Sequence, residues 1–160
     1  MVEVAQQLNQ IIEDAHTRLM TITEANASSK PYDEKWSYKE ILGHLIDSAS
    51  NNHQRFVRMQ ETNAIGAFRY NQEHWVHSQN YLAEPWEALV NLWYYYNKHL
   101  VHVIANIDPH TLNSTCDMGY PKSATLKFVV EDYVRHVQHH INQIFGNYNP
   151  RQRPQWVRSQ

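Results

Sequence analysis

The feature that most constrains the fold is a helical repeat of apolar residues in four separate segments. In each segment apolar side chains recur every three or four positions, which places them on one face of an α-helix. The segments span residues 4–25, 38–61, 85–107 and 125–145. The alternation typical of β-strands is not sustained anywhere in the sequence. The pattern therefore predicts an all-α fold, and four such helices indicate a four-helix bundle.

Residues that favour helix ends mark the boundaries of these segments. Ser37, with Glu40 three positions later, predicts a capping box for the second helix, and Pro85 is a favourable start for the third. Gly146 is typical of the position just after a helix. The connections are expected at residues 26–37, 62–84 and 108–124, the middle one with a short helical turn near 74–78. We therefore expect one domain over residues 1–146 and a polar tail over residues 147–160.

Charge and cysteine content limit which partners and which cellular compartment we expect for the protein. The 160 residues carry a formal net charge of -2 and contain no block of Lys and Arg, which argues against a nucleic-acid partner. The single cysteine, Cys116, cannot form an internal disulfide and has no context typical of a nucleophile. No secretion signal and no apolar run of membrane-spanning length is found. We expect a cytoplasmic protein without a membrane partner.

Histidine is frequent, with 11 residues, and two of them lie together in the last predicted helix. Because a helix turns about 100° per residue, His136 and His140 project from the same edge of its apolar face. This i, i+4 spacing allows two imidazoles to bind one metal ion. Hydrogen-bonded or solvated pairs have the same spacing, so the residues alone leave both interpretations open.

The second predicted helix carries a polar track beside its apolar face. The track begins at His44 and continues through Ser48, Asn51 and Arg55. Three neutral imidazoles from two helices would bind Zn²⁺ or a similar ion and leave a position open for water, as catalytic sites do. Asp47 could orient an imidazole or accept a proton. Alternatively, Asp47 is an ordinary surface acid and the rest of the track is a solvated face.

The other histidines show weaker patterns. His53 falls on the opposite flank of the second helix from His44. His99 and His102 point away from the apolar face of the third helix, and we expect them at the surface. His74 and His77 could reach the metal site from the long connection, but their positions fit solvated loop residues better.

Two stretches contain motifs of a known family. Residues 35–56 (KWSYKEILGHLIDSASNNHQRF) contain W-S-x-x-E-x-L-x-H-L-x-D-S, and residues 125–144 (TLKFVVEDYVRHVQHHINQI) contain H-x-x-H-H-x-x-Q-I. Together with YNQEHW at residues 70–75, they resemble the DinB-like superfamily over most of residues 1–146. The nearest branch contains metal-dependent hydrolases and bacillithiol S-transferases.

This resemblance implies an up-down-down-up four-helix bundle that is often a homodimer. It also implies one divalent metal ion, held by the residues that match the family's ligands, His44, His136 and His140. Zn²⁺, Ni²⁺, Mn²⁺ and Fe²⁺ all remain open as the ion. Arg55 matches an arginine common in that branch and could contact an anionic group, although a surface salt bridge explains it equally well.

Three kinds of function fit these features. In the first, an enzyme uses the metal held by three histidines to activate water or a thiol for attack on a small-molecule substrate. Such an enzyme is a hydrolase or a thiol S-transferase, the latter with a low-molecular-weight thiol as cosubstrate. In the second, the bundle binds a metal or ligand in a stress response without catalysis. In the third, the bundle has a purely structural role as an interaction module, and its histidines bind no metal. We favour the enzyme.

Overall fold

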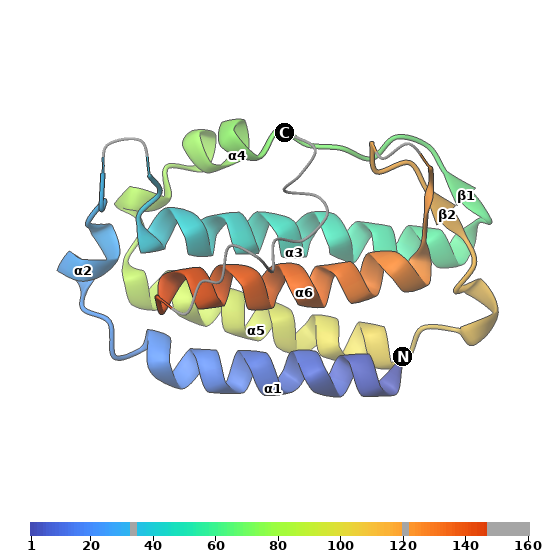
Figure 1. Ribbon diagram of the computed structural model, residues 1–160, viewed down its shortest axis with the longest axis horizontal. Helices are drawn as coiled ribbons and strands as arrows, with labels where there is room; N and C mark the ends of the chain where they lie inside the picture. The colour runs from blue at the N-terminus through green and yellow to red at the C-terminus, as the bar shows by residue number, and fades with distance from the viewer. Residues whose placement is uncertain (33–34, 120–121, 147–160) are drawn as a thin grey trace.

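Four long helices form the molecule in a computed structural model, which describes residues 1–32, 35–119 and 122–146. They are α1 (Val2–Leu19), α3 (Tyr38–Glu61), α5 (Trp86–Ala105) and α6 (Leu126–Ile144). In Figure 1, α3 and α5 run in one direction while α1 and α6 run in the other. This order confirms the predicted all-α, up-down-down-up four-helix bundle. The polar tail predicted for residues 147–160 lies outside the described residues.

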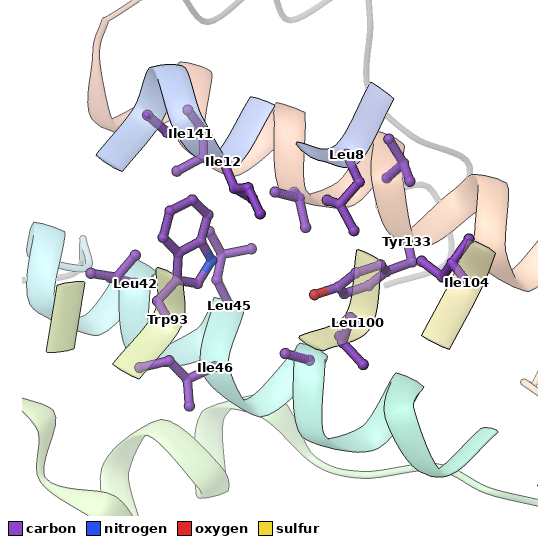
Figure 2. Packing of buried hydrophobic residues seen from close by; sticks show 14 of the residues in the cluster. Leu8, Ile12, Leu42, Leu45, Ile46, Trp93, Leu100, Ile104, Tyr133 and Ile141 are labelled. Atoms are coloured by element: carbon purple, nitrogen blue, oxygen red, sulfur yellow. The ribbon is translucent and has the colours of Figure 1, made fainter. Parts of the chain in front are cut away.

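The four helices surround one apolar core. α1 packs against α5, α5 against α3, α3 against α6 and α6 against α1. Figure 2 shows the indole ring of Trp93, from α5, among Ile12 of α1 and Leu42 and Leu45 of α3. Because α3 and α6 are neighbours, side chains on their facing edges can meet. Among the described residues, none of the helices combines the length and the apolar character that a membrane span requires.

One buried polar residue links two helices inside this core. Asn97 of α5 is fully buried, and its Oδ1 accepts a hydrogen bond of 2.6 Å from the hydroxyl of Tyr133 on α6. Its Nδ2 donates to the backbone carbonyl of Trp93 at 2.8 Å. Both ends of the amide are thus satisfied, as buried polar groups require.

The first predicted helix is divided into two. The side chain of Thr23 accepts a backbone hydrogen bond and begins a separate helix, α2 (Glu24–Ser28). Threonine offers the backbone this alternative to a continuous helix, which the apolar repeat does not reveal. Glu24 then forms an ion pair with the buried Lys39 of α3. The short helix therefore ties the first connection to the start of α3.

The two later connections are more ordered than predicted. They contain a helix, α4 (Gln72–Gln79), two 3₁₀ turns, η1 (Tyr81–Ala83) and η2 (Pro109–Thr111), and three strands, β1 (Ala64–Ile65), β2 (Thr115–Cys116) and β3 (Ala124–Thr125). β1 pairs in parallel with β2, and β2 pairs antiparallel with β3. The strands pack at one end of the bundle (Figure 1). Strands of two residues are too short to show an alternating pattern in the sequence.

The structure confirms the predicted start of α3 and the predicted C-terminal end of α6. Ser37 accepts a hydrogen bond from the backbone N–H of Glu40, and the Glu40 carboxylate accepts one from the backbone N–H of Ser37. α6 ends at Ile144, and Gly146 follows with a φ of 72°, in the left-handed region that glycine adopts at no steric cost. These caps determine where the two histidine-bearing helices begin or end.

Candidate metal centre

Three histidines come together between α3 and α6. His44 lies on α3, and His136 and His140 lie one turn apart on α6. Each offers a nitrogen, and these atoms lie within 4.8 Å of one another, the one such group of three found in the described residues. The side chains are buried, with exposed fractions of 1%, 8% and 7%. The structure thus brings together the three residues predicted as ligands.

The spacing of these nitrogens suits a shared metal ion. His44 Nε2 lies 3.0 Å from His136 Nε2. Two nitrogens bound at about 2.0–2.1 Å to a tetrahedral Zn²⁺ would be about 3.3 Å apart. The three rings meet edge to face, with centroids separated by 4.6 to 5.0 Å. The donor set and its spacing therefore fit a divalent ion of the zinc type.

Hydrogen bonds orient the two rings of α6. His136 Nδ1 lies 3.2 Å from Ser48 Oγ, which also accepts a hydrogen bond from Asn52 Nδ2 at 3.3 Å. His140 Nδ1 lies 2.9 Å from Gln143 Oε1. An amide oxygen only accepts, so Nδ1 of His140 carries the proton and Nε2 carries the lone pair. Such outer partners hold a ring in the orientation that ligation needs.

Burial keeps all three imidazoles neutral. It lowers the pKa of His44 to about 4. For His136 and His140, burial first and then repulsion from neighbouring imidazoles lower the pKa well below its ordinary value. A metal binds the neutral ring, so protons do not compete with it at neutral pH.

A cavity of about 260 Å³ opens beside the histidines. Its wall includes His44 and His136 together with Ser48, Arg55, Tyr70 and Asp132. Ligand pockets usually measure about 300–1,000 Å³, so this cavity lies just below the lower end of that range. It would admit a small molecule to two of the three histidines.

The polar track of α3 is buried, so its interpretation as a solvated face is wrong. Ser48, Asn51 and Arg55 are only 3%, 4% and 6% exposed. Arg55 donates to Asn52 Oδ1 at 3.1 Å and to the backbone carbonyl of Phe68. These bonds hold the guanidinium in the cavity wall.

Asp132 is a residue of the cavity wall that the sequence analysis missed. It precedes His136 by one turn of α6 and is 7% exposed. Burial raises its pKa, although Arg135 donates a hydrogen bond of 3.0 Å to the carboxylate. The i, i+4 spacing to His136 was the available signal, because residues so spaced share a helix face.

Asp47 is not the surface acid that one interpretation allowed. It is 1% exposed, and its Oδ1 accepts hydrogen bonds from the hydroxyl of Tyr81 at 2.6 Å and from Gln79. Burial raises its pKa despite these two bonds. Burial raises the pKa of Tyr70, which lines the cavity, to about 12, and the charge of Asp47 adds to this shift. A part for Asp47 in orienting an imidazole or accepting a proton stays a prediction.

Replacing Gly43 with Ala tests how Asp47 is held. The added Cβ would overlap the ring of Tyr81, which packs directly on this glycine. The ring must move and weaken its bond to Asp47, so we expect a loss of about 1–3 kcal/mol in unfolding free energy, measured by urea titration. Gly66→Ala is the control, because no atom lies within 4 Å of its added Cβ. A Gly43→Ala protein as stable as the control would contradict this packing.

Other residues considered from the sequence lie outside the group of three. His74 and His77 are exposed on α4, as expected for solvated positions. Cys116 is fully buried, and burial raises the pKa of its thiol. A buried thiol with a raised pKa is a poor nucleophile, in agreement with the sequence analysis.

An up-down-down-up bundle with three convergent histidines beside a cavity defines a class of helical proteins with a candidate metal centre. The family model described as the DinB superfamily matches residues 7–144. The chain belongs to the DinB superfamily. No curated protein matches the sequence.

A solved structure shares the fold. It is YfiT from Bacillus subtilis, described as a probable metal-dependent hydrolase with an unusual four-helix bundle topology. The TM-score is 0.78 at 17% sequence identity, and the match covers 92% of this chain and 87% of that one. At this level of sequence identity, the match shows only that the two proteins share a fold.

Proposed function

We propose that this protein is a metal-dependent hydrolase or thiol S-transferase acting on a small molecule. One observation carries the proposal, namely the convergence of His44, His136 and His140 within 4.8 Å, with two of the three in the wall of a cavity. The description of YfiT as a probable metal-dependent hydrolase supports the same class of activity. Three histidines are also the ligand set that leaves a coordination position open in catalytic sites.

The protein's own residues would hold and orient the ion. A divalent ion held by these residues, whether Zn²⁺, Ni²⁺, Mn²⁺ or Fe²⁺, would supply the Lewis acidity that activates water or a thiol for attack. Ser48 and Gln143 orient the rings of His136 and His140 through their Nδ1 atoms. Burial around the three rings excludes competing protons and strengthens the local electrostatic interactions.

The cavity wall suggests how a substrate is bound. Arg55 would contact an anionic group of the substrate, because its buried guanidinium faces the cavity. Asp132, with its raised pKa, lies in the same wall and can accept or donate a proton. Asp47 would act from behind the wall, through its influence on Tyr70. Hydrolysis and thiol transfer then differ only in whether water or a thiol attacks.

Elemental analysis of the untagged protein and its His136→Ala variant tests this proposal. We expect about one divalent ion per chain in the wild type and loss of both metal and turnover in the variant, because one of three ligands is removed. His139→Ala is the matched control, since this neighbouring imidazole is not in the group of three. Circular dichroism checks that both variants fold.

The outcomes separate the three kinds of function. Turnover in hydrolase or thiol-transfer panels that disappears with the metal supports the enzyme. Metal without turnover across both panels supports a binding bundle instead. No metal, even after reconstitution with Zn²⁺, Ni²⁺ or Mn²⁺, leaves an interaction bundle with incidental histidines. Turnover that survives loss of the metal contradicts the proposed mechanism.

A further inference from the structure

A second group of histidines lies on the other flank of α3. Since a helix turns about 100° per residue, His53 points about 180° away from His44. His53 meets Tyr96 and His99 of α5, and His102 follows one turn later on that helix. The sequence could place His99 and His102 at the surface, but it could not show that α3 supplies a third imidazole beside them.

The rings of His53 and His99 meet edge to face, as those of the metal centre do, at a slightly larger separation. Their ring centroids are 5.2 Å apart and the rings cross at 74°. The three ring pairs of the metal centre are 4.6 to 5.0 Å apart and cross at 71° to 76°. His102 differs, because its ring stacks 6.5 Å from that of His99 at 25°. The geometry therefore selects His53 and His99 as a pair and leaves His102 out.

Tyr96 gives His53 the outer partner that a metal ligand usually has. The Tyr96 hydroxyl lies 3.2 Å from His53 Nδ1, on the same helix as His99. When this oxygen accepts the Nδ1 proton, the lone pair of the ring lies on Nε2. Burial and the charge of His99 lower the pKa of His53, which favours its neutral, metal-binding form. His99 is exposed, so water can complete the coordination.

We propose that His53 and His99 form a second, surface site for a borderline divalent ion, Cu²⁺, Ni²⁺ or Zn²⁺. Imidazole suits these ions, and an ion held by two imidazoles and water binds less tightly than one held by three. The site shares no residue with His44, His136 and His140, so it does not rest on the proposed function. It would give the bundle one exchangeable ion on the α3–α5 face.

Calorimetric titration of the full, metal-stripped chain with Zn²⁺ tests the second site. We expect a weaker binding event beside that of the metal centre. His99→Ala should weaken this event at least about tenfold, because loss of an outer partner alone costs about 10–100-fold. His102→Ala is the matched control, exposed on the same helix one turn away. On addition of Ni²⁺, the imidazole NMR signals of His53 and His99 should broaden after those of His44, His136 and His140, because the metal centre binds the ion more tightly.

The result does not depend on the metal centre. The weaker event should persist in His136→Ala, which removes the tight one, and it should weaken at least about tenfold in His99→Ala, which keeps the tight one. A wild-type chain with no second event overturns the proposal. So does a His99→Ala chain that binds as well as His102→Ala, since the histidine pair would then be only a packing contact.

Discussion

Acid is expected to destabilise the metal-free protein by about 3 kcal/mol through His44 alone. Its pKa is about 4 in the folded chain, against the ordinary value of 6.5 that it recovers on unfolding. Between these values the unfolded chain binds a proton that the folded chain does not, so the free energy of unfolding falls as the pH falls. Each pKa unit between the ordinary value of 6.5 and the folded value of about 4 corresponds to about 1.36 kcal/mol, which gives the stated loss. His136 and His140, with lowered pKa values, add to it.

Urea unfolding of chelator-treated protein across this pH window measures the loss. A His44→Leu variant is the control, because it fills a similar volume without a titrating group and should show a shallower dependence on pH. Excess Zn²⁺ should shift the wild-type curve to lower pH, since the ion binds only the neutral rings. Identical pH slopes for the wild type and His44→Leu would show that this imidazole does not titrate on unfolding as described.

Replacing Trp93 with Ala is expected to cost about 3–5 kcal/mol of unfolding free energy. The indole is fully buried at the centre of the bundle, where α1, α3 and α5 contribute side chains around it (Figure 2). Truncation leaves a cavity that three rigid helices cannot close, so the lost transfer free energy and the cavity penalty add. The midpoint of urea or thermal unfolding measures the change.

Two further variants separate ring volume from general disturbance of α5. Trp93→Phe should cost less than Trp93→Ala, because it keeps an aromatic ring and removes a buried Nε1 that has no hydrogen-bond partner in the described structure. Leu92→Ala, at an exposed neighbouring position, should change stability by no more than about 0.5 kcal/mol. A Leu92→Ala loss as large as that of Trp93→Ala would mean that the helix, and not the core, responds.

The sequence analysis located the long helices because each buries one continuous apolar face. It failed where local polar contacts interrupt a helix, as at Thr23, or where paired segments are only two residues long, as in β1 and β2. The pairing of β1 with β2 joins residues that lie far apart along the chain. Such contacts leave no periodic pattern.

For the site, the sequence indicated which histidines share a flank but not what surrounds them. His136 and His140 were paired by their spacing on one helix, His44 was selected from its flank of the second helix, and the family resemblance implied the same three ligands. The burial of Asp47 and the presence of Asp132 in the cavity wall became evident only from the packing of α3 on α6. The homodimer and the cytoplasmic location stay predictions.

By itself, then, the sequence determined the helices, their apolar faces and the directions of side chains within each helix, because these follow from about 3.6 residues per turn. Only the tertiary structure decided which faces meet. It placed His44 against His136 and His53 against His99, pairs contributed by different helices. A distance between helices depends on how whole surfaces pack, and that is a property of many residues at once.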